Sequence, residues 1–213
     1  MDGNRRWAKG HLLPRAAGHR AGVKNIKTIV KTAIDYGVEA VTLYAFSTEN
    51  KGREKTEVDA LIDLIRKHLL PLAKEVMACG ARVMFLGDLS YFPDDVQRIA
   101  DGVFKDGEGL DKRVNIALNY SGRDEILRAA KLAAVDGELN RDTFEKHLYT
   151  EGTPDLDMII RTGGEKRLSN FMLYQAAYSE LFFTDTLWPD FGKEELLSIL
   201  DEYSHRTRRF GTL

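Results

Sequence analysis

Short apolar runs alternate along the chain with longer segments in which apolar residues recur at helical spacing. The short runs predict strands at Ala40–Phe46, Arg82–Leu86, Val114–Leu118, Met158–Ile160 and Leu181–Phe183. The helical spacing predicts helices at Val23–Tyr36, Thr56–Cys79, Asp94–Phe104, Arg123–Val135, Arg141–Leu148 and Lys193 to about Arg206. Helix C-caps are expected at Gly37, Gly80 and Gly137. This alternation predicts an α/β fold with a central, mostly parallel sheet flanked by helices.

The longest predicted helix carries one wide apolar stripe, formed by Val58, Leu61, Ile62, Ile65, Leu69, Leu72 and Val76. Such a stripe usually packs into a core, and the sequence alone favours that interpretation. The alternative is that the stripe walls a tunnel for a hydrocarbon chain. Pro71 lies inside the pattern, where it removes a backbone donor and clashes with the preceding turn, so we expect a kink there.

The composition is that of a soluble globular protein, with 213 residues, 43% of them hydrophobic and 30% charged. A net charge of -2 argues against a general nucleic-acid-binding surface and leaves phosphorylated small molecules as the better expectation. The single Cys79 excludes an intramolecular disulfide and suits a reducing cytoplasm. No signal peptide and no apolar segment of membrane-spanning length are visible.

The segment from Met158 to Asn170 combines residues that suit a diphosphate. An apolar run ends at Arg161, two glycines follow at Gly163 and Gly164, and Arg167 and Ser169 come next. Glycines let the backbone approach an anion, and arginine forks match phosphate oxygens in pairs. Ser169 or Asn170 is expected to cap a following helix, whose N–H groups would add to the anion site. The alternative is a Gly-Gly turn with solvated charges.

A second polar cluster stands at the chain start, in Asp2-Gly3-Asn4-Arg5-Arg6-Trp7-Ala8, with Arg15 and Gly18-His19-Arg20-Ala21-Gly22 after it. A carboxylate beside arginines can hold Mg²⁺ against a diphosphate. Gly18 and His19 are expected to open a helix and add an anion site. The alternatives are a frayed basic terminus and a structural histidine.

Two further polar clusters follow predicted strands directly. They are Ser47-Thr48-Glu49-Asn50-Lys51-Gly52-Arg53 and Asn119-Tyr120-Ser121-Gly122-Arg123. Ligands of open α/β sheets bind at the carboxyl ends of strands, so both clusters are candidates for the same site. Capping of the next helix explains either cluster equally well. The cationic residues from Arg206 to Arg209 stand at the end of a predicted helix, where such charges are favoured anyway.

Taken together, these motifs resemble those of the cis-prenyltransferases, most closely the bacterial undecaprenyl diphosphate synthases. The motifs run in family order from residue 1 to residue 211, and Tyr44-Ala45-Phe46-Ser47-Thr48-Glu49-Asn50, Ile160-Arg161-Thr162-Gly163-Gly164-Glu165 and Trp188-Pro189-Asp190-Phe191 are among them. The resemblance implies a single domain over residues 1–213 with a hydrophobic tunnel. It also implies a Mg²⁺-dependent enzyme that adds isopentenyl diphosphate units, in the Z configuration, to an allylic starter such as farnesyl diphosphate.

The resemblance also assigns roles by position. Asp2 matches the essential carboxylate that acts with Mg²⁺, Glu180 matches a second metal ligand, and Asn50 matches a residue often assigned to proton removal, which we interpret as a positioning group. The allylic-substrate positions are Gly3, Asn4, Arg5, Arg6, Trp7, Arg15 and His19, with further contacts at Ser47, Thr48, Glu49, Lys51 and Arg53. The isopentenyl diphosphate positions are Arg161, Arg167, Leu168 and Ser169. Arg209 matches a motif that reaches a neighbouring subunit's site.

The chain departs from the family pattern in three places. Members carry a hydrophobic strand before Asp-Gly-Asn, whereas this sequence begins at Met1, so we expect the sequence to be trimmed before Asp2 rather than the fold to be a variant one. Lys51-Gly52-Arg53-Glu54 replaces the usual Trp-x-Arg-Pro, which predicts a weaker starter contact and a mobile loop over Ser47–Glu57. Lys166 occupies a position where histidine or glutamine is frequent.

The expected partners are the two diphosphates and a second copy of the chain, with a transient membrane-surface contact for product release, no nucleic acid, and a cytoplasmic location. A homodimer is expected because one strand's inner face cannot bury all of the large apolar residues Tyr178, Leu181, Phe182, Phe183 and Trp188. Two alternatives remain, a catalytically impaired partner subunit of an active homologue and a phosphate-ester hydrolase. Retention of Asp2, Arg161 and Ser169 argues against the first, and the lack of an obvious nucleophile argues against the second.

Overall fold

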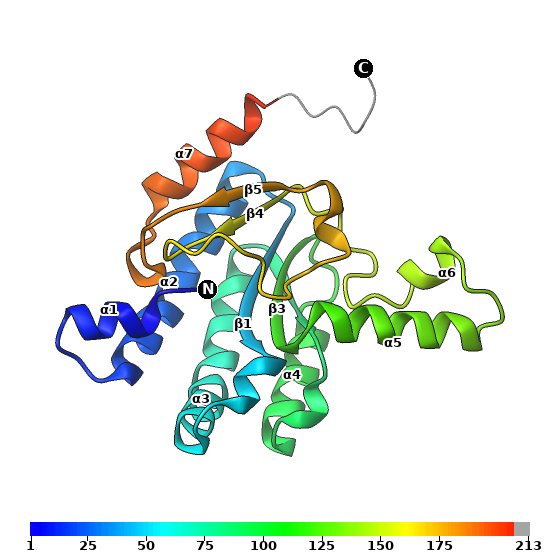
Figure 1. Cartoon of the computed structure of the whole chain (residues 1–213), viewed down its shortest axis with the longest axis horizontal. Helices are drawn as coiled ribbons and strands as arrows, with labels where there is room; N and C mark the ends of the chain where they lie inside the picture. Colours follow the sequence, from blue (N-terminus) through cyan, green and yellow to red (C-terminus); the bar gives the residue numbers. More distant parts are fainter. Residues whose placement is uncertain (207–213) are drawn as a thin grey trace. The chain divides into compact units, whose positions relative to one another are not determined.

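The structure of the chain is a computed structural model that describes residues 1–206. These residues form two compact units. The first comprises Met1–Val38, Asp155–Arg167 and the described residues from Gln175 to Arg206, and the second comprises Glu39–Pro154 and Leu168–Tyr174. Each unit combines parallel strands with helices (Figure 1), which confirms the predicted α/β class.

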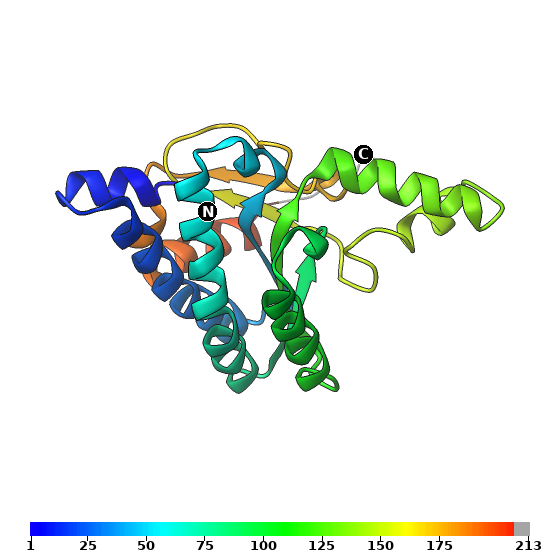
Figure 2. The same cartoon turned by 90° about the horizontal axis from the view of Figure 1, so that it is seen from below.

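The second unit is built on a three-stranded parallel sheet of order β1-β3-β2. Its elements are β1 (Ala40–Ser47), η1 (Thr48–Gly52), α3 (Lys55–Ala78), β2 (Ala81–Leu86), η2 (Leu89–Tyr91), α4 (Asp94–Asp106), β3 (Lys112–Tyr120), α5 (Gly122–Val135) and α6 (Arg141–Glu145). In the central strand β3, every residue from Val114 to Tyr120 is buried, as expected for a parallel strand covered on both faces. Helices α3 and α4 lie side by side and pack on β2 (Figure 2).

The carboxyl ends of β1 and β3 meet at one edge of this sheet, where Ser47 pairs with Tyr120. The short helix η1 therefore begins at the edge from which α5 also begins. This alignment brings two of the four predicted polar clusters together, at the edge where open parallel sheets place their ligands.

The first unit contains a two-stranded parallel sheet of β4 (Met158–Arg161) and β5 (Glu180–Phe183). Its remaining elements are α1 (Asn4–Gly10), α2 (Arg15–Tyr36), η3 (Gln175–Tyr178), η4 (Trp188–Asp190) and α7 (Lys193–Ser204). Helix α2 contacts α1, α7 and η4. The indole of Trp188 is buried and donates a hydrogen bond to the Gly22 carbonyl across 2.8 Å, which fixes η4 to α2.

Two details of the first unit differ from the sequence-based expectation. Helix α1 was not predicted, and α2 begins at Arg15, behind Pro14, rather than at Val23. Glycines inside α2 obscured its start, because glycine usually weakens a helix. Here they allow close packing, since a Cβ atom on Gly18 would lie 2.0 Å from the Asn4 carbonyl oxygen and one on Gly22 would lie 2.2 Å from Asn4 Oδ1. Gly18 therefore does not open a helix, and the anion site expected at such an opening is not supported.

The other predicted helices are confirmed, with ends shifted by a few residues. Residues Gly37, Gly80 and Gly137 have φ values of 110°, 82° and 106°, the left-handed conformation of a helix C-cap. Helix α3 runs unbroken through Pro71, so the bend expected there stays a prediction. Its apolar stripe divides into a buried part, with Leu69, Leu72 and Val76, and a half-buried part, with Leu61, Ile62 and Ile65.

Candidate active site

In the first unit, Asp2 is fixed by both its backbone and its side chain. The Thr162 hydroxyl donates to the Asp2 carbonyl across 2.9 Å and accepts from the Asp2 N–H across 3.2 Å. The Asp2 carboxylate accepts a 2.9 Å hydrogen bond from Arg161 Nη2 and a 3.1 Å bond from the Gly3 N–H. The carboxylate is therefore held at the end of β4, beside Arg161, the last residue of that strand.

The Gly163-Gly164 turn supports this arrangement without offering its own amides. Both glycines adopt left-handed φ values, 86° and 77°, and a Cβ atom on Gly163 would lie 2.6 Å from Arg6 Nη2. Their N–H groups donate to the carbonyls of Thr186 and Thr184, each across 2.8 Å. The turn thus makes room for neighbouring groups, and the Arg6 guanidinium donates to the Gly163 carbonyl across 2.6 Å.

Two arginines at the turn face different environments. The side chain of Arg161 is 15% exposed, and besides Asp2 it donates to the Arg167 carbonyl. The side chain of Arg167 is 59% exposed and pairs with Glu165. An anion that reaches Arg167 must therefore compete with one solvated carboxylate, whereas Arg161 is already committed to Asp2 and to the backbone.

The remaining first-unit candidates stand on α1 and α2. The Trp7 indole donates to Asp190 across 2.7 Å, so it ties α1 to η4. The Asn4 side chain is held between the helices with its Oδ1 atom buried and unpaired within the described part of the chain, which is a feature that calls for an explanation. Arg5 and Arg15 are exposed, whereas His19 is half-buried on α2.

In the second unit, Ser47 and Asn50 form a reciprocal cap at the start of η1. The Ser47 N–H donates to Asn50 Oδ1 across 3.2 Å, and the Ser47 side chain accepts from the Asn50 N–H. The side chain of Asn50 is therefore held by the first residue of the turn. Further along the same loop, Arg53 pairs with Glu57 across 2.9 Å and ties η1 to α3.

Glu49 lies on η1 beside Thr48. Partial burial opposes ionisation of the Glu49 carboxyl, but hydrogen bonds from Asn170, Ser47 and Thr48 outweigh it and lower the pKa of Glu49. The bond from Asn170 Nδ2 to Glu49 Oε1 spans 2.8 Å. This carboxylate therefore stays ionised at neutral pH and is held in one orientation.

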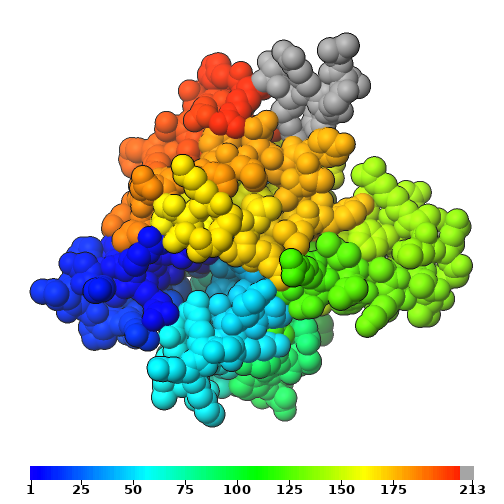
Figure 3. Space-filling model, viewed as in Figure 1, coloured from blue at the N-terminus to red at the C-terminus, as the bar shows by residue number. Residues whose placement is uncertain are grey.

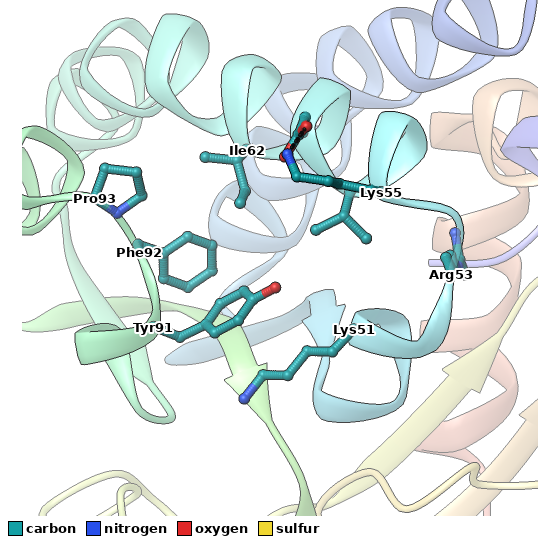
Figure 4. Close-up of a pocket in the computed structure, with 9 residues that line it drawn as sticks. Lys51, Arg53, Lys55, Ile62, Tyr91, Phe92 and Pro93 are labelled. Carbon is teal, nitrogen blue, oxygen red and sulfur yellow. Dashed lines mark hydrogen bonds and ion pairs between the residues drawn. The ribbon is translucent and has the colours of Figure 1, made fainter.

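Lys51 lies over the ring of Tyr91 in the second unit, with Nζ 4.3 Å from the ring centroid. The η1 segment and the start of α3 lie open on the molecular surface (Figure 3, cyan). Lys51 and Tyr91 both line a cavity of about 460 Å³ between η1, the start of α3 and η2 (Figure 4). The other lining residues of this cavity are Arg53, Lys55, Val58, Asp59, Ile62, Phe92 and Pro93. Position 51 is thus placed against an apolar wall with a cationic rim.

The segment after the Gly-Gly turn does not form the expected helix. Ser169 and Asn170 have φ values of 49° and 63°, which belong to the left-handed region and cannot begin a right-handed helix. Asn170 caps a distant helix instead, because its Oδ1 accepts from the Arg123 N–H at the start of α5 across 2.9 Å. Ser121 caps the same helix by accepting from the Asp124 N–H across 3.3 Å, which is one of the two interpretations that the sequence left open for this cluster. Leu168 is half-buried and Ser169 exposed.

Glu180, the second predicted metal ligand, begins β5 and pairs with Arg206 across 2.6 Å. No group of three or more histidine, cysteine, aspartate or glutamate side chains that could hold a metal occurs within residues 1–206. Arg209 and the rest of the C-terminal motif lie outside the described residues. The same described part contains no helix of the length and apolarity needed to cross a membrane.

Sequence reasoning did not foresee the partners of two residues that organise these groups. Thr162 fixes the Asp2 backbone, and its only signal was its place between Arg161 and Gly163. Asn170 joins three polar segments, and its signal was an asparagine beside Ser169, a residue type that tolerates the left-handed region.

The chain is similar to known proteins over nearly its whole length. Residues 1–211 match the family model described as "Putative undecaprenyl diphosphate synthase". The chain is 47% identical to an isoprenyl transferase of Clostridium perfringens, over 99% of this chain and 87% of that protein. It is 41% identical to an isoprenyl transferase of Aquifex aeolicus, over 99% and 93%.

A solved structure shows the same fold. Lavandulyl diphosphate synthase from Lavandula x intermedia, in complex with dimethylallyl diphosphate, matches with a TM-score of 0.92 and 35% identity, over 99% of this chain and 95% of that chain. A family match over nearly the whole sequence, together with relatives above 40% identity, leaves one assignment. The chain belongs to the undecaprenyl diphosphate synthase family and is a prenyltransferase.

Proposed function

We propose that the chain condenses isopentenyl diphosphate with an allylic diphosphate, by preference farnesyl diphosphate. The product is a long-chain Z-polyprenyl diphosphate such as undecaprenyl diphosphate, the lipid-carrier precursor for cell-wall synthesis. The observation that carries the proposal is the partly exposed Asp2 carboxylate, held 2.9 Å from Arg161 at the end of β4 in a chain of this family.

The proposed reaction develops charge on the leaving diphosphate. The bond between C1 of the allylic chain and its diphosphate oxygen breaks, and the double bond of isopentenyl diphosphate attacks C1 through its terminal carbon. The attack leaves positive charge on C3 of isopentenyl diphosphate, and a proton then leaves C2, so that a new double bond forms between C2 and C3. We assign acceptance of this proton to the departing diphosphate. Negative charge grows on the leaving group, so preplaced cations lower the barrier.

In the first unit, we assign Arg161 and Arg167 to the diphosphate of isopentenyl diphosphate. The exposed Arg167 side chain and its weak surface pair with Glu165 support this role, because such a pair is readily exchanged for a phosphate. The allylic diphosphate is assigned to Gly3, Asn4, Arg5, Arg6, Trp7, Arg15 and His19.

In the second unit, Ser47, Thr48, Glu49 and Arg53 are assigned to further substrate contacts, with Leu168 and Ser169 on the isopentenyl side. Asn50 orients the η1 turn and takes no proton, because its amide is a poor base and already accepts from Ser47. The half-buried Leu61, Ile62 and Ile65 leave apolar surface on α3. We assign this surface to the wall of a hydrophobic tunnel for the growing chain.

The donor set near Asp2 fits Mg²⁺ that is shared with a substrate. Magnesium takes one or two carboxylates together with phosphate oxygens and water, and Asp2 supplies one carboxylate that is 42% exposed. When bound, the ion would neutralise charge on the allylic diphosphate. Glu180 stays a predicted second ligand, and it would have to exchange its ion pair with Arg206 for the metal.

We also propose a homodimer. Tyr178, Leu181 and Phe183 are 69%, 41% and 37% exposed, whereas Phe182 and Trp188 are buried. These three large apolar side chains, at the end of η3 and on β5, are therefore available for a second copy to cover. We place the enzyme in the cytoplasm, with a transient contact with the membrane surface when the apolar product leaves.

The proposal is tested by incubating the purified chain with radiolabelled isopentenyl diphosphate and one of three starters: dimethylallyl, geranyl or farnesyl diphosphate. Each reaction is run with Mg²⁺ and with EDTA, and the products are separated by chain length. We expect metal-dependent long-chain product, most rapidly from farnesyl diphosphate. No product from the chain alone, together with stimulation of an added active homologue, would support the partner-subunit alternative instead.

A further inference from the structure

Asn170 joins three polar segments of the second unit through one side chain. Its Nδ2 atom donates to Glu49 Oε1 and to Ser121 Oγ, each across 2.8 Å. Its Oδ1 atom accepts from the Arg123 N–H across 2.9 Å, and its carbonyl accepts from the Gly122 N–H across 2.8 Å. The amide therefore uses both of its donor hydrogens and its acceptor.

The backbone around Asn170 is held in an unusual conformation. Ser169, Asn170 and Met172 all have left-handed φ values, of 49°, 63° and 45°. Residues of this kind persist only when their surroundings fix them, and they gather at functional sites. Two contacts fix this segment: Met172 is buried, and the Phe171 ring stacks on Tyr44 with 4.6 Å between centroids.

Tyr44 extends the same connection into β1. Its hydroxyl lies 3.3 Å from the Tyr120 carbonyl at the end of β3, and 3.5 Å from the Ser169 carbonyl. Ser169 is thus linked to β1 on one side and, through the next residue, to η1 and α5 on the other. A displacement of Ser169 should therefore also move Glu49, because the side chain of the next residue, Asn170, is hydrogen-bonded to Glu49.

We propose that Asn170 is a positioning residue that couples the two diphosphate sites. Under the proposed function, on which this inference rests, Ser169 serves isopentenyl diphosphate and the Ser47–Arg53 segment serves the starter. Asn170 touches neither substrate but holds both segments in one arrangement. Binding of either diphosphate orders that arrangement, so the second diphosphate binds more tightly, and by linkage the effect is equal in both directions.

Two substitutions separate the parts of this role. Asn170→Asp keeps the size and the acceptor for the Arg123 N–H but lacks the donors, and it places a carboxylate against Glu49. Asn170→Gly keeps the left-handed backbone and the Gly122 bond but lacks the whole side chain. Combining Asn170→Asp with Glu49→Gln restores a hydrogen bond, because the new amide at position 49 would donate to the new carboxylate at position 170. Glu49→Gln alone is the matched control.

The coupling is measured as the ratio of two dissociation constants for farnesyl thiodiphosphate, a starter that ionises very slowly, without and with saturating isopentenyl diphosphate. We expect a ratio of at least about fivefold in the parent, in the usual range for coupled sites. The ratio should fall to near one in both Asn170 variants, and it should recover in the double variant. The pKa of Glu49, followed by NMR, should rise in Asn170→Gly, because its hydrogen bond is lost.

Each outcome decides the question. A parent ratio near one, or an unchanged ratio in folded Asn170 variants, overturns the inference. Equal weakening of both ligands with an unchanged ratio means that Asn170 is structural only. If Asn170→Asp unfolds, the Asn170→Gly variant and the double variant carry the test. Failure of the proposed function is distinguished from these results, because the parent would then bind neither diphosphate and form no product.

Discussion

The guanidinium of Arg161 donates a hydrogen bond to the carboxylate of Asp2 across 2.9 Å, although the two residues lie 159 positions apart in the sequence. The pair is asymmetric, because the Asp2 side chain is 42% exposed and that of Arg161 is 15% exposed. Arg161 thus orients the carboxylate while one side of Asp2 stays open to solvent and to a ligand. Arg161, which we propose for isopentenyl diphosphate, therefore positions Asp2, which we propose for Mg²⁺.

We predict that Asp2→Asn and Asp2→Ala lower kcat by at least about a hundredfold, the effect of removing a group that stabilises developing charge. The melting temperature should change by only a few degrees, because a partly exposed ion pair contributes about 1 kcal/mol or less. Steady-state kinetics and thermal unfolding measure both effects. Activity of Asp2→Ala within a few-fold of the parent contradicts the assignment.

Arg161→Ala and Arg167→Ala should both raise KM for isopentenyl diphosphate far more than KM for the starter, since each removes a charge-assisted phosphate contact. The structure adds a difference between them. Arg161→Ala should also lower kcat, because Asp2 loses its orienting partner, whereas the Arg167 side chain pairs with Glu165 and leaves Asp2 untouched.

Kinetics with each substrate varied in turn separate the two effects. Arg167→Lys serves as the matched control, because it keeps the charge but loses the planar fork. An equal rise of both KM values in either alanine variant would mean that the arginine is placed at the wrong substrate.

The sequence predicted the elements better than the residues that join them. The five strands within residues 1–206 were found because buried parallel strands are rich in apolar residues, and in β3 this holds despite the buried Asn115. The start of α2 was missed because Gly18 and Gly22 serve a helix contact with Asn4 that is absent from any local pattern. A local sequence pattern shows which face of a helix or strand is apolar. It does not show which distant segment of the backbone packs against that face.

The candidate site shows the same limit. Residue type and order were enough to name Asp2, Arg161 and Arg167, because a carboxylate and a guanidinium suit a metal and a phosphate whatever their partners. The roles of Thr162 and Asn170 depend on partners far away in sequence, Asp2 in one case and Glu49 and Arg123 in the other. The Gly-Gly turn was assigned to anion contact, yet its amides pair with Thr184 and Thr186.

The dimer prediction concerns the outer side of β5. Leu181 and Phe183 point to the same side of the strand and are 41% and 37% exposed, whereas Phe182 points inward and is 6% exposed. Leu181→Asp or Phe183→Asp should therefore convert a dimer to a monomer without unfolding it. Light scattering at micromolar concentration measures the mass, and a monomeric parent would contradict the proposal.

The C-terminal segment provides a related test. Deleting residues 206–213 should lower activity more than dimerisation if Arg209 reaches a neighbouring site. The matched deletion of 207–213 keeps Arg206, whose guanidinium pairs with Glu180 and Glu202. Comparing the two deletions separates the loss of this internal pair from the loss of Arg209.

The last prediction concerns Lys51, where the resemblance to the family leads us to expect tryptophan. Its ammonium lies over the Tyr91 ring at the cavity of about 460 Å³ and is neither paired with a carboxylate in the described structure nor packed as an apolar group. An indole would supply flat apolar contact that a hydrated ammonium cannot reproduce. Lys51→Trp should therefore tighten starter binding by roughly five- to tenfold, about 1 kcal/mol, with little change for isopentenyl diphosphate.

Binding titrations of both diphosphates check this expectation. Lys55→Trp is the matched control, because Lys55 lines the same cavity but pairs with Asp59 across 2.6 Å, on the exposed side of α3. The loop over Ser47–Glu57 should also become less mobile in the Lys51→Trp protein, as measured by hydrogen exchange, because the indole packs where the ammonium is solvated. Unchanged or weaker starter binding by Lys51→Trp, or equal tightening by Lys55→Trp, would mean that position 51 does not face the substrate.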